Sequence, residues 1–299
     1  MLTSWIYHYR TNRAGFATPA LTKKKGKNMF RTLFSVGSFD IHTYGVMQAI
    51  AFFTAIFITI RRVKKEGIDP NIIFDLAIWV LISLVIGARI WYVVEHLSEY
   101  SKNPFDIFKI WEGGLVFYGG FIGALLGALL FLRIRKLSFT KIGDLAAPSF
   151  AIGIAIGRIG CFLNGCCYGR VSYRFGITFP AREFPPAYAD QLKHNLIKPG
   201  AAESLPVIPT QLYSVLDNLI IFVILIFLSR RKPFQGFLIW IFFGLHGVHR
   251  FIIDFFRYYE GTAKVLRILT LSQITSLCLI ILSISAIVIL HRAKKKKTS

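Results

Sequence analysis

The chain has 299 residues, of which 54% are hydrophobic, and its mean hydropathy is +0.54. A soluble domain of this size cannot bury so much apolar surface, so the composition favours a protein that crosses a membrane several times. The formal net charge of +21 suggests nucleic acid as a partner. However, the lysines and arginines lie between apolar runs and at the two ends, and no compact basic domain exists to carry that function. We therefore expect no nucleic-acid partner and interpret the basic loops as facing an anionic lipid leaflet.

Residues 1–36 are predicted to be an extension that precedes the membrane domain. The segment is basic and lacks the roughly 7–15-residue apolar core of a signal peptide. Translation that starts at Met29 would leave this basic segment out. We therefore expect residues 1–28 to be a disordered extension or the product of a translation start assigned too far upstream.

Seven apolar runs, each long enough to cross a bilayer, follow this extension. They lie near residues 42–60, 72–94, 115–132, 142–160, 210–229, 236–253 and 270–290. The fourth run contains Pro148 and several glycines, so we expect a bent or broken helix there. The sequence thus predicts an all-α, polytopic integral membrane protein, with its membrane domain at residues 37–292 and a basic tail at 293–299.

The distribution of charge predicts the orientation of the spans. Basic residues follow the first, third, fifth and seventh spans, at Arg61, Arg62, Lys64, Lys65, Arg133, Arg135, Lys136, Lys141, Arg230, Arg231, Lys232, Arg292 and Lys294 to Lys297. Because loops rich in lysine and arginine stay in the cytoplasm, we expect the C-terminus inside and the N-terminus outside. The long connection at about residues 161–209 then faces outward.

Arg158 ends the fourth apolar run, within a segment at residues 157–170 that also holds several glycines and Asn164. A guanidinium group costs roughly 2.5 kcal/mol or more near the centre of a bilayer, so its presence requires a reason. Glycines let other groups approach the backbone closely. The combination predicts a polar pocket for an anionic group at the membrane surface, with a lipid phosphate as the obvious candidate.

The sixth apolar run carries a second polar group. His246, Arg250, Asp254 and Arg257 share one face of a helix. Arg250 and Asp254 form either an internal ion pair or, in the sharper interpretation, part of the pocket that holds Arg158. Arginine suits such a pocket because its planar fork binds two phosphate oxygens together and stays charged.

In the third apolar run, glycines at 119, 123 and 127 recur every four residues, which is typical of close helix packing. Tyr118 beside them is either a residue at the membrane interface or a hydroxyl of the pocket, and both interpretations stay open.

Three of the four cysteines, Cys161, Cys166 and Cys167, lie within seven residues of each other. Their spacing lacks the paired pattern of a zinc site, and packing of small residues is the favoured interpretation. An outward-facing disulfide and a metal site are alternatives, and His246 with His249 lacks further ligands for a metal. We therefore assign no metal site. Since no Gly-x-Ser-x-Gly motif occurs, we expect an enzyme here to use a nucleophile of its substrate.

At these residues the chain resembles the prolipoprotein diacylglyceryl transferase family, over about residues 37–292. The most specific match is the segment 157–170. Four further motifs occur in the family's order: Tyr44-Gly45, Gly113-Gly114 with Gly119-Gly120, Pro209 to Tyr213, and Arg250 with Phe255 to Arg257.

The resemblance implies a seven-span enzyme of the bacterial inner membrane. The family moves the diacylglyceryl group of phosphatidylglycerol to the lipobox cysteine of a prolipoprotein signal peptide and releases glycerol phosphate. It uses no cofactor or metal, and its partners are the lipid, the prolipoprotein and the bilayer.

The resemblance also implies the roles of individual residues. Arg158 and Arg250 would hold the phosphate and stabilise the charge that develops on the leaving oxygen. Asn164 and Tyr44 would orient the headgroup. The catalytic set is Arg158, Arg250, Tyr118 and Asn164, and the substrate-binding set is Arg158, Tyr44, Gly119, Gly120, Gly169, Arg250, Asp254 and Arg257.

Several positions depart from the family's commonest pattern. Tyr118 stands where many members have His, and a tyrosine with a reference pKa of about 10 is a poor general base near neutrality. Cys161 and Cys166 stand where Asn and Glu are usual, Ile208 replaces a His, and Asp254 replaces a Glu. His246 is a substitute base on spacing alone, so the sequence leaves the proton acceptor open.

Two rival functions remain. The first is a transporter or flippase of an anionic lipid or solute that uses the same arginine-lined pocket. Against it, the spans show no evident inverted repeat. The second is a transferase of the same fold with a different acceptor. The sequence leaves open the lipid preference, the oligomeric state and the redox state of the clustered cysteines.

Overall fold

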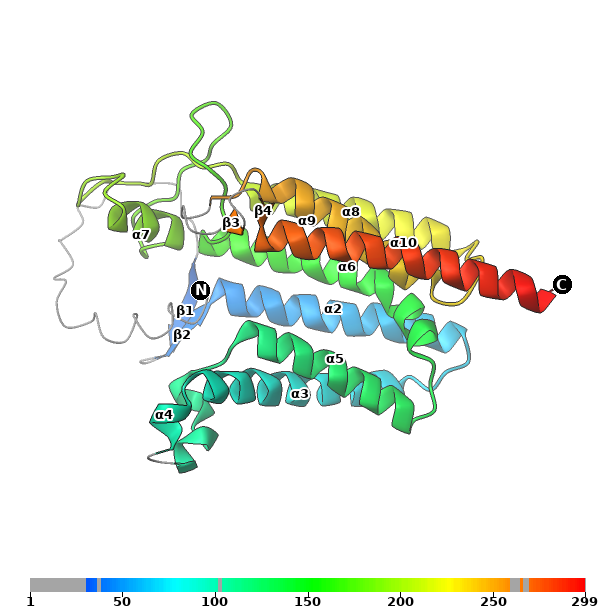
Figure 1. Cartoon of the computed structure of the whole chain (residues 1–299). Coiled ribbons are helices and arrows are strands. Elements are labelled where there is room, and N and C mark those ends of the chain that lie inside the picture. The colour runs from blue at the N-terminus through cyan, green and yellow to red at the C-terminus, as the bar shows by residue number, and fades with distance from the viewer. Residues whose placement is uncertain (1–30, 37–38, 102–103, 259–263, 266–268, 299) are drawn as a thin grey trace. The chain divides into compact units, whose positions relative to one another are not determined.

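The computed structural model describes residues 31–36, 39–101, 104–258, 264–265 and 269–298 (Figure 1). The chain forms two compact units. In the described part of the chain, unit 1 comprises residues 63–139, and unit 2 comprises residues 31–62 and the chain from residue 140 onward. The residues 1–28 that we expect to be an extension lie outside the described residues.

Seven helices in the described residues are long and apolar enough to cross a membrane. They are α2 (Thr43–Lys65), α3 (Asn71–Glu95), α5 (Phe117–Ile134), α6 (Phe139–Asn164), α8 (Thr210–Ser229), α9 (Phe237–Asp254) and α10 (Leu271–Thr298). In the most apolar stretch of α6, 56% of the residues are buried in the protein, against 11% for both α3 and α10. Helix α6 is therefore an interior helix, whereas α3 and α10 leave most of their apolar surface for lipid. The predicted all-α, seven-span fold is confirmed.

Unit 1 consists mainly of α3 and α5, which pack through small residues. A Cβ atom on Gly123 would lie 2.3 Å from the carbonyl oxygen of Ser83, and one on Gly119 would lie 2.4 Å from that of Gly87. A Cβ atom on Gly127 would lie 2.2 Å from the side-chain oxygen of Ser83. The glycine stripe predicted from the sequence is thus a helix-packing surface, as GxxxG-type patterns are in membranes.

A buried arginine organises the segment between α3 and α5, which contains α4 (Leu97–Tyr100) and the short helices η2 (Pro104–Phe108) and η3 (Ile110–Glu112). Arg89 of α3 is only 6% exposed. Its guanidinium donates to the carbonyl oxygens of Ile107, Asp106 and Gly113 at 2.6–2.8 Å. The buried charge is therefore satisfied by backbone carbonyls, and the segment is held on the end of α3.

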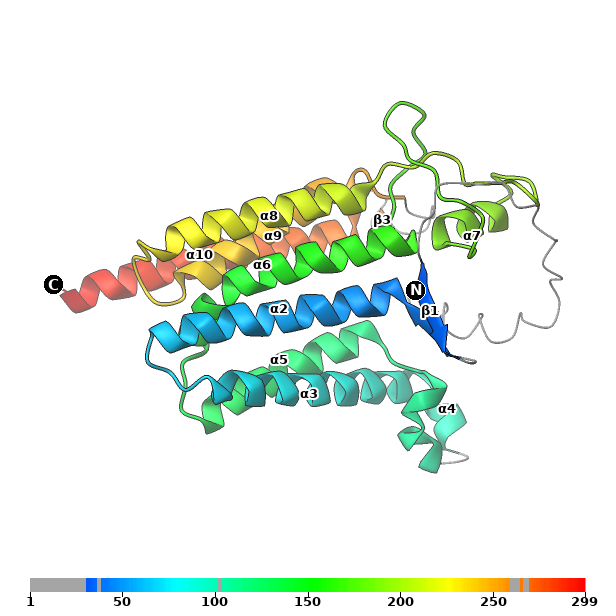
Figure 2. The ribbon, with the colours of Figure 1, turned by 180° about the vertical axis from the view of Figure 1, so that it is seen from behind.

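Unit 2 is built around α6, and its other long helices run alongside it (Figures 1 and 2). Buried apolar residues of α6, α8 and α9 form its core: Ala147, Ala151, Ile221, Leu225, Leu238, Ile239 and Phe242. Helix α10 packs against α9. Pro148 lies inside α6 without interrupting it, since the helix runs from residue 139 to residue 164. Of the two expectations for this proline, a bend or a break, the break does not occur.

The long connection after α6 folds into a small cap, defined here as residues 165–209. It contains helix α7 (Pro186–Lys193) and two buried clusters, one around Phe179 and Val207 and one around Tyr188 and Ile197. In Figures 1 and 2 the cap lies at one end of the helices of unit 2, and the C-terminal end of α10 lies at the other.

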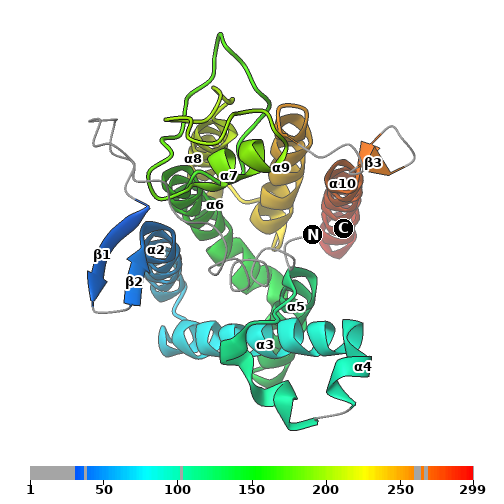
Figure 3. The ribbon, with the colours of Figure 1, turned by 90° about the vertical axis from the view of Figure 1, so that its left-hand side faces the viewer.

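The described residues of unit 2 also contain four short strands. Strands β1 (Thr32–Val36) and β2 (Phe39–His42) form an antiparallel hairpin, and β3 (Lys264–Val265) pairs with β4 (Leu269–Thr270). Figure 3 shows the hairpin beside the start of α2. The sequence predicts that residues 31–36 belong to the N-terminal extension, whereas the structure makes them part of unit 2. The amide of Thr32 donates to the Glu183 carboxylate of the cap at 2.8 Å.

Candidate functional site

Arg158 lies near the C-terminal end of α6, where two flanking glycines pack against α2. A Cβ atom on Gly157 would lie 2.8 Å from Oε1 of Gln48, and one on Gly160 would lie 2.9 Å from Cβ of Met47. These glycines therefore allow α2 and α6 to approach each other. The approach brings the Tyr44 ring next to Gly160, and Nε2 of Gln48 donates to the Tyr44 hydroxyl at 2.8 Å.

Asn164, the last residue of α6, contacts Arg31, an arginine that no sequence motif indicates. Its Oδ1 accepts from Nε of Arg31 at 3.1 Å. The same guanidinium donates to the carbonyl oxygens of Glu183 and Phe184 at 2.7 and 3.0 Å. Arg31 thus joins the end of α6 to the cap. No motif marks it, and it falls in the segment that we assigned to the extension.

Arg158 of α6 and Arg250 of α9 lie in one neighbourhood. The charges of both guanidiniums act on the same two imidazoles, those of His246 and His249. Both arginines are half-buried. Two cations from separate spans that share two neighbours form a positively charged region at the cap end of unit 2, which suits an anionic ligand.

Arg250 also has a carboxylate neighbour. Its Nη2 lies 3.6 Å from Oδ1 of Asp254, whose side chain is fully buried. The Thr270 hydroxyl donates to the other carboxylate oxygen of Asp254. The ion pair that the sequence offered as one interpretation is therefore present. Arg250 also lies beside the neighbours of Arg158, and its part in a shared pocket stays a prediction.

The two histidines of α9 differ in their partners. Nδ1 of His249 lies 2.8 Å from Oδ2 of Asp217 on α8, a pairing that nothing in the sequence pattern indicated. The ring of His246 stacks on Phe242 at 5.7 Å, and its buried Nδ1 has no hydrogen-bond partner among the described residues.

The three clustered cysteines come together at the end of α6. The sulfur atoms of Cys161, Cys166 and Cys167 all lie within 4.8 Å of one another, and all three are free thiols. Cys161 is buried and the other two are half-buried. Helix α8 fixes the turn, because Gln211 Nε2 donates to the carbonyl of Cys166 and Thr210 Oγ1 to that of Cys167, both at 2.7 Å.

The two cysteines beyond α6 differ in acidity. Hydrogen bonds from the Cys161 and Cys166 thiols, together with the charges of Arg257 and Arg158, lower the pKa of Cys167. Hydrogen bonds to Cys161 and Cys167, together with burial, raise the pKa of Cys166. The cluster therefore favours one thiolate that its neighbours stabilise, rather than three.

Gly169 joins the turn to the end of α9. A Cβ atom on Gly169 would lie 2.5 Å from the carbonyl oxygen of Phe256, and the amide of Arg170 donates to that oxygen at 2.9 Å. This contact brings Arg257 near the thiol of Cys167. The glycine is thus explained by close packing, and its assignment to the substrate-binding set stays a prediction.

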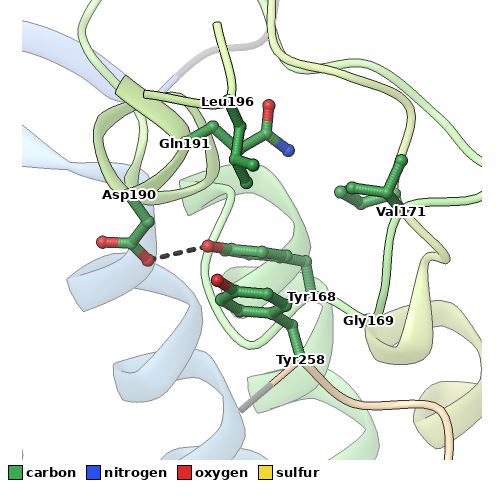
Figure 4. Close-up of a pocket in the computed structure, with 8 residues that line it drawn as sticks. Tyr168, Gly169, Val171, Asp190, Gln191, Leu196 and Tyr258 are labelled. Atoms are coloured by element: carbon green, nitrogen blue, oxygen red, sulfur yellow. Dashed lines mark hydrogen bonds between the residues drawn. The ribbon is translucent and has the colours of Figure 1, made fainter. Parts of the chain in front are cut away.

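The cap contains a small cavity lined by Tyr168, Asp190, Gln191 and Tyr258, among others (Figure 4). The Tyr168 hydroxyl donates to Asp190 at 2.7 Å, and the ring stacks on that of Tyr258. The cavity of about 10 Å³ has room for about one water molecule. It is too small for a lipid headgroup, so it belongs to the packing of the cap.

Three of the predicted site residues lie in unit 1. Tyr118 is 57% exposed at the start of α5, and Gly119 and Gly120 are buried against α3. The tight contacts of Gly119 with Trp91 and Gly87 give it a packing role. The participation of Tyr118, Gly119 and Gly120 in the site stays a prediction.

Comparison with known proteins places the chain in one family. Residues 31–289 match the profile of the prolipoprotein diacylglyceryl transferase family. A phosphatidylglycerol–prolipoprotein diacylglyceryl transferase of Geobacter sulfurreducens is 31% identical over 271 residues, which cover 87% of this chain and 95% of the relative. The enzyme of that name from Listeria monocytogenes is 36% identical over 267 residues, covering 87% and 88%. The chain therefore belongs to the prolipoprotein diacylglyceryl transferase family.

Proposed function

We propose that this protein transfers the diacylglyceryl group of phosphatidylglycerol to the lipobox cysteine thiol of a prolipoprotein and releases glycerol phosphate. The relatives are named for this activity, and the similarity covers most of their length. The observation that carries the proposal is that Arg158 and Arg250, from separate spans, share His246 and His249 as neighbours.

The chemistry needs a thiolate and a stabilised leaving group. The sulfur attacks the glyceryl carbon that bears the phosphate, an S–C bond forms, and the C–O bond breaks with its electron pair going to the phosphate oxygen. Negative charge therefore grows on glycerol phosphate. Arg158 and Arg250 hold this phosphate with paired N–H donors, so their interaction strengthens as the charge develops.

The remaining residues position the reactants. Tyr44 and Asn164 orient the headgroup, and Asp254 and Arg257 hold Arg250 and the turn after α6 in place. Gly169 allows that turn to approach α9. Gly119, Gly120 and Tyr118 of unit 1 remain predicted residues of the site.

The proposed partners and location follow from this reaction. The chain is a multi-pass membrane protein. We place it in the bacterial inner membrane, with phosphatidylglycerol and the lipobox of a prolipoprotein signal peptide as its substrates.

The experiment uses purified protein, phosphatidylglycerol vesicles and a lipobox peptide. Release of glycerol phosphate together with a peptide heavier by one diacylglyceryl group supports transfer. Movement of lipid between leaflets with no covalent product indicates a transporter instead. A peptide with Ser in place of its cysteine is the control and should stay unmodified.

A further inference from the structure

We propose that Cys161, Cys166 and Cys167 form a binding site for a thiol-preferring divalent metal ion, Zn²⁺, and that the acceptor thiol binds at its fourth coordination position. The metal site stands on the geometry of the three thiols. The role of the fourth position rests on the proposed function.

The spacing of the sulfur atoms suits tetrahedral zinc. Zinc binds thiolates at about 2.3 Å, so two sulfurs in a tetrahedral site lie about 3.8 Å apart. The three sulfurs here lie within 4.8 Å of one another. This upper limit is only about 1 Å above the tetrahedral spacing, so the three sulfurs are close enough to bind one ion.

The backbone of the turn is already fixed. Gly165 and Cys167 adopt positive φ angles of 70° and 61°, which fold the chain back directly after α6. Hydrogen bonds from Gln211 and Thr210 then hold the carbonyls of Cys166 and Cys167 on α8. A positive φ angle is unfavourable for cysteine, so packing alone does not explain why the turn presents this thiol beside the other two.

The surrounding charge balances the site. Three thiolates and one Zn²⁺ ion carry a net charge of −1. Arg158 acts electrostatically on Cys161 and Cys167, and Arg257 acts on Cys167. These guanidiniums offset the excess negative charge, which a half-buried site in a membrane protein requires.

The number of ligands indicates an open position. Across the described residues, the only group of His, Cys, Asp and Glu side chains close enough to hold a metal consists of these three cysteines. Structural zinc sites use four protein ligands, whereas reactive sites use three and leave one position for water or substrate. A substrate whose reacting group is itself a thiol fits that position.

Metal binding would supply the deprotonated nucleophile. On binding Zn²⁺ the acceptor thiol loses its proton to solvent, because a coordinated thiol ionises outright. The thiolate then attacks the glyceryl carbon, and the C–O electron pair leaves with the phosphate. The thioether product is a weaker ligand and dissociates, and glycerol phosphate takes up a proton from water. No oxidant or reductant is needed, since Zn²⁺ has no redox chemistry.

The first test needs only the wild-type chain, purified under reducing conditions without chelator. We expect about one Zn²⁺ per chain by elemental analysis. With Co²⁺ as the probe, we expect sulfur-to-cobalt charge-transfer absorption in the near ultraviolet and tetrahedral bands in the visible. Absence of bound metal together with full transfer activity in excess chelator overturns the metal site and leaves the proposed function standing.

Variants separate the cluster from other thiols. Cys161→Ser, Cys166→Ser and Cys167→Ser should each lower the metal content at least about tenfold. Cys278→Ser, an exposed thiol on α10, is the matched control and should keep the full content. Peptide mapping that finds a disulfide between two of the clustered cysteines in protein from untreated membranes overturns the proposal.

The role of the fourth position has its own readout. Adding the lipobox peptide to the cobalt-loaded protein should shift the visible bands, whereas its Cys→Ser form should not. Removal of zinc should lower the transfer rate at least about tenfold, and Zn²⁺ should restore it. Bound metal with an unchanged spectrum and unchanged transfer after its removal overturns the activation of the thiol.

Discussion

Arg158 is the residue on which the proposed chemistry depends most directly. We expect Arg158→Ala to lower the initial rate of glycerol phosphate release by at least about 100-fold, because the charge on the leaving phosphate loses a preorganised donor. Arg158→Lys should restore only part of the rate, since an ammonium group cannot bind two phosphate oxygens as a planar fork does. Rates are measured with phosphatidylglycerol vesicles and a lipobox peptide.

Arg174→Ala is the control for loss of a positive charge at the same end of unit 2. Arg174 is exposed in the cap and stacks on Phe175, so its removal should leave the rate within about twofold of wild type. A wild-type rate in Arg158→Ala would remove Arg158 from the mechanism.

Asp144 gives a second prediction at the scale of one residue, and it concerns stability. Its buried carboxylate accepts the amides of Gly236 and Ile239 at 2.7 and 3.0 Å, at the start of α9. Asp144→Ala leaves both amides unsatisfied, so we expect it to lower the free energy of unfolding by about 2–4 kcal/mol. Asp144→Asn retains one acceptor and should cost about half as much. Thermal unfolding in detergent measures both.

Asp75→Asn is the matched control on α3. Its carboxylate pairs with Arg135 at 2.9 Å, but both side chains are about half exposed. Exposed ion pairs contribute about 0–1 kcal/mol, so this variant should melt close to wild type. Equal melting temperatures for Asp144→Ala and Asp75→Asn would contradict a stabilising role for Asp144.

At the scale of the elements, the α3–α5 pair depends on its glycines. A methyl group on Gly123 would meet the Ser83 carbonyl at 2.3 Å, and backbone cannot rotate away as a side chain can. We therefore expect Gly123→Ala to destabilise the pair by about 1–3 kcal/mol, although alanine favours a helix over glycine by about 1 kcal/mol. The loss of stability is measured from the unfolding transition of unit 1, which is monitored by the protease sensitivity of residues 104–114.

Gly153→Ala on α6 is the matched control for a helical glycine. The nearest atom to its added methyl group would be the Ala51 carbonyl oxygen at 3.5 Å, an ordinary contact distance. This substitution should be neutral or slightly stabilising. If Gly123→Ala and Gly153→Ala are equally stable, the close approach of α3 and α5 does not explain the glycine stripe.

The positions of the elements could be predicted because hydropathy acts locally along the chain. The predicted spans and the observed helices differ by only a few residues at most ends, and the stripe at Gly119 and Gly123 was recognisable from its period. The prediction left open a bend or a break at Pro148, and the break does not occur because proline breaks a helix only where the packing does not hold it. Ala147 and Ala151 flank Pro148 in the buried core, and α6 stays continuous.

The site was predictable only in part, because side chains with no motif of their own complete it. Arg31 meets Asn164 across 133 residues of chain, and Asp217 meets His249 across 32. Such pairs arise from tertiary packing and leave no local periodicity. The closeness of the three cysteines likewise depends on the turn at Cys167 and its contacts with α8.

At the scale of the whole molecule, charge predicts how unit 2 lies in the membrane. The cap and the basic end of α10 lie at opposite ends of the unit (Figure 1). Since basic segments stay in the cytoplasm, the cap should face outward. We expect Tyr173→Cys, at an 81% exposed position of the cap, to react with a membrane-impermeant maleimide on intact cells.

Lys295→Cys, at the exposed end of α10, should react with the same maleimide only after the membrane is opened. The unsubstituted chain supplies the background from its four native cysteines. Labelling of Lys295→Cys but not Tyr173→Cys on intact cells would reverse the orientation. The acceptor thiol would then have to reach Arg158 and the cysteine cluster from the cytoplasm, because both lie at the cap end of α6.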